Sequence, residues 1–179
     1  MIYSSKNWQN YAYSGCKYVS RITKHVEPFV EVTVNTFKEF VGIDVAPRHP
    51  HFLDPDKGFE WDISAVIGLS GAVKGAVIIS MKAELAIKLT DLLADPGHTE
   101  IDADVVDAIG EINNIIAGNI KPKIPNGEKI VISIPTIIKG KEHSIAWPSK
   151  ATRILCIPHK AFENDIFHLM VAIELENEK

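Results

Sequence analysis

Residues 101–124, IDADVVDAIGEINNIIAGNIKPKI, hold the side chains with the clearest chemical potential in this chain. Asp102 or Asp104 could accept hydrogen bonds from the free N–H groups that begin a helix, and Pro122 lies just past the expected end of that helix. At about 100° per residue, a set of branched apolar side chains falls in a stripe about 80° wide. This pattern predicts a long helix whose apolar stripe faces a core. The stripe consists of Val105, Ile109, Ile112, Ile116 and Ile120.

Polar residues lie together on the opposite side of this helix. Asp107, Glu111, Asn114 and Gly118 fall within a sector about 60° wide, because their spacings are close to whole helical turns. A carboxylate can form a charge-assisted bond to a cation, and an amide can both donate to and accept from a water. Glu111 and Asn114 therefore face outward together, where they are free to act on another molecule. Asn113 falls outside the sector and suits a local structural hydrogen bond.

Asp107 and Gly118 are auxiliary candidates on the same face. Asp107 could offset the positive end of the helix. A glycine inside a helix costs about 1 kcal/mol relative to alanine, so Gly118 suggests that another molecule approaches closely there. Gly110 lies nearer the flank and is expected to allow tight packing. Without further information, a row of exposed Asp, Glu and Asn equally describes an ordinary solvated helix face.

Other segments predict the elements that position this helix. Apolar residues at helical spacing predict a first helix from Glu27-Pro28 to near Gly42. Alternating and β-branched runs predict strands, and the glycines of residues 68–75 predict a hairpin turn. The predicted fold class is α+β, with an antiparallel sheet covered by helices on one face. The remaining expected elements are strands at 59–67, 76–81, 128–140, 152–159 and 165–175, and a helix at 83–95.

The chain length fits a single domain with one substantial core. Residues 1–24 lack a clean period and are interpreted as an N-terminal extension, with residues 25–179 as the domain. The residues APRHPHFLDPDKG between the first helix and the first strand are expected to form a loop. Pro135 falls within a strand-like run, where proline marks an edge or a bulge.

Composition excludes several classes of partner and site. A formal net charge of −4 argues against nucleic acid and anionic membrane surfaces as partners. Cys16 and Cys156 lie far apart in no zinc-type spacing, which favours a reducing, cytoplasmic location over a disulfide framework. The N-terminal residues lack the continuous apolar run of a signal peptide or membrane anchor.

Histidines in the expected loop offer a competing chemistry. His49 and His51 have the spacing of a metal pair and lie near Asp54 and Asp56, so a metal-dependent hydrolase is one alternative. The pattern lacks the helical HExxH arrangement that would make it specific. His168 lies within an apolar strand run and is expected to be half-buried in the sheet rather than to act as a base.

Three further patterns favour structural roles. The glycines of GLSGAVKG lack the terminal GK[ST] of a phosphate loop, so a hairpin is the better interpretation. Trp61 and Trp147 are expected in the core or at its edge. Ser64, Ser70 and Ser80 lack the GxSxG context of an exposed nucleophile.

Asp107-x3-Glu111-x2-Asn114, followed by Ala117-Gly118-Asn119 and the residues SIPT at 133–136, resembles the signature of the CheC/CheX/FliY phosphatases. The similarity is closest to CheX. It extends through HVEPFVEVTVNTF, IGLSGAVKGAVIIS and SIPTIIKGK, and covers about residues 25–175. The resemblance implies a CheC-like fold with a long site-bearing helix.

The resemblance also implies a reaction, hydrolysis of the aspartyl phosphate of a CheY-like response regulator. Glu111 would pair with the receiver lysine, and Asn114 would hold the attacking water. The protein would need no cofactor of its own, because the receiver would supply a divalent metal, Mg²⁺. CheX-like members carry one site per chain and form homodimers through their sheet edges. Glu31 and Asn35 of the first helix are four residues apart and do not repeat the motif.

A noncatalytic alternative uses the same surface. A binding module that sequesters a phosphorylated receiver would need nearly the same docking face as an enzyme. The sequence leaves this alternative open, together with the metal-dependent hydrolase at His49 and His51.

Overall fold

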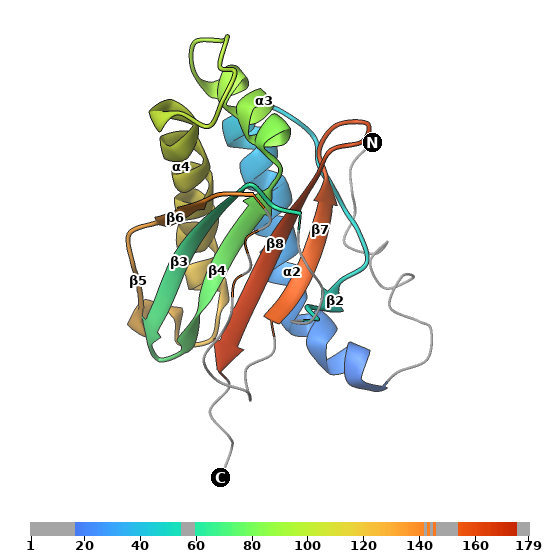
Figure 1. Cartoon of the computed structure of the whole chain (residues 1–179). Coiled ribbons are helices and arrows are strands. Elements are labelled where there is room, and N and C mark those ends of the chain that lie inside the picture. The colour runs from blue at the N-terminus through green and yellow to red at the C-terminus, as the bar shows by residue number, and fades with distance from the viewer. Residues whose placement is uncertain (1–16, 55–59, 142, 144, 146–153, 175–179) are drawn as a thin grey trace.

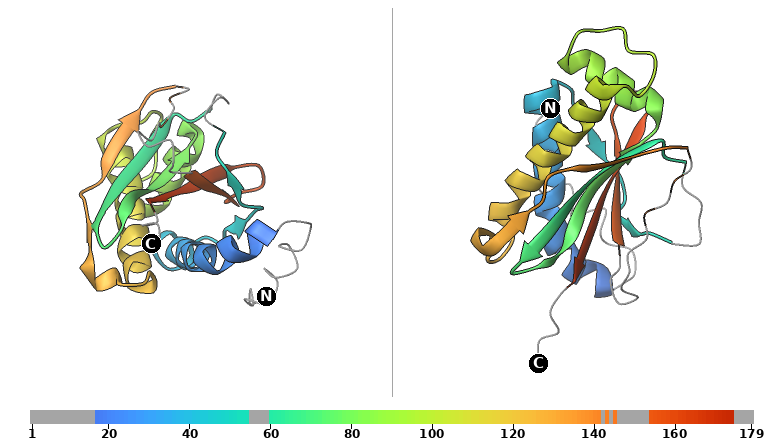
Figure 2. Two further views of the ribbon diagram at one scale, coloured as in Figure 1. Left: turned by 90° about the horizontal axis from the view of Figure 1, so that it is seen from below. Right: turned by 60° about the vertical axis from the view of Figure 1, so that its left-hand side comes forward.

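A layer of helices packs on one face of an antiparallel sheet in the computed structural model (Figure 1). The structure describes residues 17–54, 60–141, 143, 145 and 154–174. Seen along the sheet, the helices lie together on one side of the strands (Figure 2). The predicted α+β class with a one-sided helical cover is confirmed. Within the described residues, no helix is long and apolar enough to cross a membrane.

The sheet has eight strands in the order β1-β7-β8-β4-β3-β5, with β2 also pairing with β7 and β6 also pairing with β3. Every pairing is antiparallel. The long strands β3, β4 and β8 form the centre, and short strands form both edges. The strands are β1 Ala46–Pro47, β2 His51–Phe52, β3 Ile63–Gly71, β4 Lys74–Met81, β5 Ile130–Ile132, β6 Thr136–Lys139, β7 Ile154–Lys160 and β8 Ile166–Glu174.

Two differences from the expected strands have local causes. The expected strand at 128–140 is divided into β5 and β6, because the regular pairing with β3 is interrupted before Thr136 and Pro135 cannot donate a backbone hydrogen bond. The expected loop after the first helix contains β1 and β2, which add to the exposed edge of β7. The hairpin between β3 and β4 is confirmed, with Gly71 at a φ of 95° in its turn.

The helices are α2 Lys17–Thr36, α3 Ala83–Leu93 and α4 Ala103–Ile120. Helix α2 begins at Lys17 rather than at Glu27, so Pro28 lies inside the helix and not in its first turn. The prediction was wrong because it equated this proline with a helix start. The helix continues as a π-helical segment, Phe37–Val41, and ends at Gly42, whose φ of 83° is left-handed.

The main core lies between the helices and the sheet. Side chains on alternate positions of β3, among them Ile63, Ala65 and Ile67, are fully buried there against α2 and α4. On the opposite face, Val66 of β3 packs against a second apolar cluster that includes Trp61 and Met170. The period of two along each strand therefore gives the sheet two buried faces at its centre.

Candidate active site on helix α4

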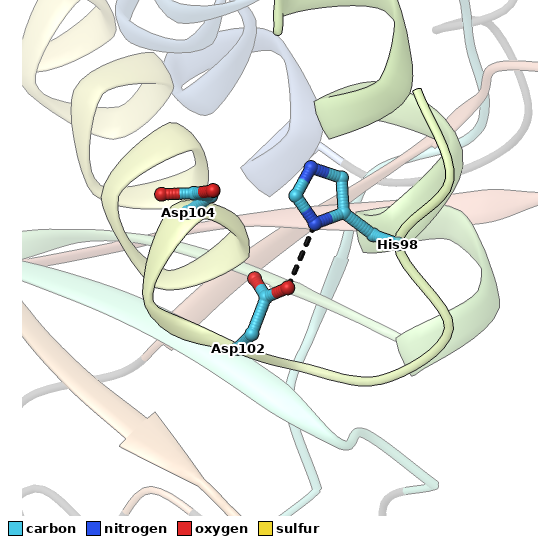
Figure 3. Close-up of side chains that lie close together, drawn as sticks. All are labelled: His98, Asp102 and Asp104. Atoms are coloured by element: carbon cyan, nitrogen blue, oxygen red, sulfur yellow. Dashed lines mark hydrogen bonds and ion pairs between the residues drawn. The ribbon is translucent and has the colours of Figure 1, made fainter. Parts of the chain in front are cut away.

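Helix α4 begins at a defined cap. The Asp102 carboxylate accepts a hydrogen bond from the Val105 N–H at 3.0 Å, which identifies Asp102 rather than Asp104 as the N-cap. The other carboxylate oxygen lies 2.7 Å from Nδ1 of His98 (Figure 3). The Val105 N–H and the His98 ring lower the pKa of Asp102, and the hydrogen bond to Asp102 raises the pKa of His98.

His98, Asp102 and Asp104 also have the composition of a cation site. In the part of the chain that the structure describes, these three side chains offer ligand atoms within 4.8 Å of one another. Asp102 is already engaged by the helix cap and by His98, and the helix N-terminus carries partial positive charge. These interactions account for the acidic groups as stabilisers of the start of α4.

A buried amide sets the rotation of α4 on the sheet. Asn113 is fully buried, and its Nδ2 donates to the carbonyl of Ala65 at 2.9 Å and to that of Val77 at 3.2 Å. These two acceptors lie on β3 and β4, at the centre of the sheet. The predicted structural role of Asn113 is confirmed. Because Asn113 points inward, the polar sector on the opposite side of α4 must point outward.

The outward sector brings Glu111 and Asn114 together. Glu111 is exposed, Asn114 is partly exposed, and Asn114 Nδ2 lies 3.5 Å from Glu111 Oε2. This separation is at the long end for a hydrogen bond, so both groups remain available to a partner. Asp107 is exposed on the same helix, one turn before Glu111.

Gly118 has no packing requirement within the described chain. A Cβ built on it would have no described atom within 4 Å, so an alanine would fit without a clash. Gly110 differs, because a Cβ there would lie 3.5 Å from Ile137 Cδ1 and 3.7 Å from Pro135 Cβ. The expectation of close packing at Gly110 is confirmed. Helix α4 therefore touches the connector between β5 and β6 beside Glu111.

That connector, Ser133–Pro135, was expected only as a shaped part of a strand. Its residue Ile134 is 85% exposed, more than the other large exposed apolar side chains of the described chain. Sequence reasoning missed this feature, since an isoleucine in a β-branched run is usually half-buried. The Ile-Pro pair was the available signal, because proline interrupts the ladder and releases its neighbour.

The other candidate residues from the sequence do not gather into a second site among the described residues. Glu31 on α2 forms an ion pair with Lys123 at 3.1 Å, so this carboxylate already has a partner within the chain. His49 and His51 are exposed, and the described residues that gather as possible metal ligands do not include them. Asp56 and Trp147 lie outside the described residues, as do Cys16 and the rest of residues 1–16.

Buried polar groups on the sheet have structural partners. The Trp61 indole N–H donates to Nδ1 of His168 at 3.1 Å, and burial lowers the pKa of His168 to about 4. Burial also raises the pKa of the free Cys156 to about 12, which keeps its thiol protonated. His168 is half-buried in the sheet, as the sequence predicted, and its ring accepts the hydrogen bond from Trp61.

Comparison with known proteins identifies relatives of this arrangement. A family model described as "Chemotaxis phosphatase CheX" matches residues 63–159, which contain β3, β4, α4 and most of the sheet. The CheY-P phosphatase CheX of Thermotoga maritima is 24% identical over 151 residues, covering 83% of this chain and 95% of the relative.

Solved structures share the fold over nearly their whole length. The chemotaxis protein CheX of Desulfovibrio desulfuricans is 25% identical with a TM-score of 0.73, covering 83% of this chain and 98% of that one. CheX in the CheX-CheY-BeF3-Mg complex of Borrelia burgdorferi is 23% identical with a TM-score of 0.71, covering 84% and 97% of the two chains. The CheC-like fold expected from the sequence is thereby confirmed.

Proposed function

Because this chain belongs to the CheX family of chemotaxis phosphatases, we propose that it hydrolyses the aspartyl phosphate of a CheY-like response regulator. Glu111 and Asn114 are the catalytic residues of this proposal. The observation that carries it is their position one helical turn apart on the outward face of α4, with Asn114 Nδ2 3.5 Å from Glu111 Oε2. The relatives from Thermotoga maritima and Borrelia burgdorferi support CheY as the kind of partner.

Glu111 determines how the partner docks. Its carboxylate is exposed and can form a charge-assisted hydrogen bond with a lysine of the receiver's active site. Asp107 adds a second negative charge on the same face and strengthens the attraction for a cationic group. Such a bond orients the receiver on the rigid helix.

Asn114 positions the nucleophile. Its amide can accept a hydrogen bond from a water and donate one to a phosphoryl oxygen, so it can hold the water in line with the phosphorus. The water attacks, the bond from phosphorus to the aspartyl oxygen breaks, and inorganic phosphate leaves the regenerated aspartate. Neither Glu111 nor Asn114 forms a covalent bond. A neutral amide also avoids the repulsion that a carboxylate would exert on an anionic phosphoryl group.

The divalent metal of the reaction belongs to the receiver in this proposal. The complex from Borrelia burgdorferi combines CheX and CheY with BeF3 and Mg, which supports a metal that arrives with the partner. A receiver-bound cation neutralises charge that develops on the phosphoryl oxygens. The contribution of this chain is then limited to docking and to orientation of the water.

The same proposal extends to organisation and location. The proposed domain boundary lies between an extension, residues 1–24, and the phosphatase domain, residues 25–179, which contains the whole family match. Helix α2, Lys17–Thr36, crosses this boundary. Two copies pair through a sheet edge, and the protein acts in the cytoplasm with its receiver. Light scattering of the purified chain measures the mass of the assembly directly.

Replacing Asn114 tests the catalytic assignment. Asn114→Ala is expected to lower the rate of accelerated phosphate release by about 100-fold, because the water loses its orientation. The measurement is phosphate release from phosphorylated receiver domains of the same organism at substoichiometric concentrations of this chain. Asn35→Ala removes an exposed asparagine of α2 and serves as the matched control.

The same assay separates catalysis from capture. A binding module would slow the decay of the aspartyl phosphate or leave it unchanged, whereas the enzyme accelerates it with turnover. Full activity of Asn114→Ala would refute the assignment of this residue.

A further inference from the structure

The connector Ser133–Pro135 presents one apolar side chain to solvent next to the catalytic helix. Ile134 is 85% exposed, although both flanking strands pair with β3. A single exposed apolar residue is common on a protein surface and needs no explanation by itself. Its meaning here depends on how firmly it is held and on what lies beside it.

Hydrogen bonds hold the backbone at Ile134 in one conformation. Ser133 N–H donates to the Gly68 carbonyl at 2.9 Å, and Gly68 N–H donates to Ser133 Oγ at 2.9 Å. The Ser133 hydroxyl in turn donates to the Ile134 carbonyl at 2.8 Å. Pro135 further restricts Ile134 to extended backbone angles. The side chain is thus presented by an ordered connector, which reduces the entropy lost when a partner covers it.

The connector is continuous with the catalytic face. A Cβ built on Gly110 would lie 3.7 Å from Pro135 Cβ, so Pro135 packs against the residue that precedes Glu111. Ile134 therefore directly precedes a residue that packs on α4, at the position just before Glu111. We expect a protein that places a cationic group on Glu111 to approach α4 close to this connector.

We propose that Ile134 is an apolar docking contact, which the receiver domain buries beside the aspartyl phosphate when Glu111 and Asn114 enter its active site. This inference rests on the proposed function. The receiver would offer an apolar patch near its active-site lysine. Apolar burial next to the pair formed by Glu111 and that lysine also excludes water and strengthens the charged bond.

Val131 provides a matched control on the same edge of the sheet. It is 64% exposed, but its neighbours Ile130 and Ile132 pack on the helix side. Alternation along β5 therefore directs Val131 to the opposite face, away from α4. Val131 is therefore an exposed, branched apolar side chain like Ile134, but it does not lie next to α4.

The test separates docking from chemistry by steady-state kinetics with a phosphorylated receiver domain. Ile134→Ala is expected to raise KM about tenfold with kcat unchanged, because the contact contributes to association and not to the reacting geometry. Ile134→Val is expected to restore most of the affinity, and Val131→Ala to change KM less than about twofold. Circular dichroism checks the folding of each variant.

A binding measurement distinguishes failure of this inference from failure of the proposed function. The probe is the receiver domain with BeF3 and Mg²⁺, titrated into this chain, its Ile134→Ala variant and its Asn114→Ala variant. Tight binding by Asn114→Ala and weakened binding by Ile134→Ala support the docking contact.

Unchanged binding and KM in Ile134→Ala overturn the contact alone. A change in oligomeric mass without a change in receiver affinity assigns Ile134 to a contact between copies and also overturns it. An unmodified chain that neither binds nor dephosphorylates any receiver overturns both proposals.

Discussion

Asn113 and Asn114 are adjacent residues of one type with opposite surroundings. Asn113 is fully buried and donates to carbonyls of β3 and β4, whereas Asn114 reaches solvent beside Glu111. A rotation of about 100° between consecutive helical residues produces this division. The inner amide orients the helix, and the outer amide is left free to meet another molecule.

Substitution of each asparagine should separate stability from activity. Asn113→Ala is expected to lower the free energy of unfolding by about 2 kcal/mol, because it removes hydrogen bonds from buried carbonyl groups. Asn114→Ala is expected to change it by less than about 0.5 kcal/mol. Urea denaturation measures both values. Equal destabilisation by the two substitutions would contradict the assigned orientations.

Helix α4 is held firmly on the sheet and exposes the face that carries Glu111 and Asn114. Its N-cap Asp102, its buried stripe and Asn113 fix the helix on the sheet, so Glu111 and Asn114 need no rearrangement to meet. Gly118 does not stabilise α4, since glycine weakens a helix. No described atom lies so close that a larger side chain would clash there. Its small size suits the approach of another molecule.

Gly118→Ala should therefore raise the stability of the protein and lower its phosphatase activity. The added methyl group enters open space, so the free energy of unfolding is expected to rise by about 1 kcal/mol. Dephosphorylation of the receiver is expected to fall, because the methyl group obstructs its docking. Thermal unfolding and phosphate release measure the two effects. A variant that is more stable and fully active would show that no partner approaches Gly118.

The molecule as a whole is a sheet buried at its centre on both faces, and this burial extends to histidines. His159 is fully buried, stacks on Phe167 with ring centroids 4.9 Å apart, and has its pKa lowered by burial to about 4. His168 on β8 has its pKa lowered to about 4 in the same way. The folded state thus holds both rings neutral at pH values where the unfolded chain binds protons.

Folding stability should consequently fall in acid. Between pH 6.5 and about 4 the unfolded chain binds more protons at His159 and His168 than the folded chain, so acidification favours unfolding. Each histidine contributes at most about 1.4 kcal/mol per pH unit in this window. His98, whose pKa is raised, stabilises fully below pH 6.5 and loses that contribution as pH rises through its folded pKa.

Urea denaturation at about pH 7, 6 and 5 measures this dependence. His159→Phe is expected to reduce the slope, because phenylalanine can occupy the stacked position without binding a proton. An unchanged slope in this variant would assign the acid sensitivity to other groups.

The sequence by itself determined the features that depend on local period and residue type. The spacing of apolar and polar residues along 101–124 predicted the inner and outer faces of α4 and the different orientations of Asn113 and Asn114. Strand alternation and the glycines of the hairpin predicted β3, β4 and the one-sided helical cover. These predictions succeeded because helix and strand periods act over a few residues and leave a direct record in the order of side chains.

Only the tertiary structure decided which distant segments meet. It brought Pro135 against Gly110, left Ile134 exposed, paired Glu31 with Lys123 and placed the acceptors of Asn113 on β3 and β4. The start of α2 was also missed, because Pro28 has the residue type of a first turn but not its position. Contacts of this kind depend on how the sheet and helices pack, and no local pattern records which surfaces of the chain become neighbours.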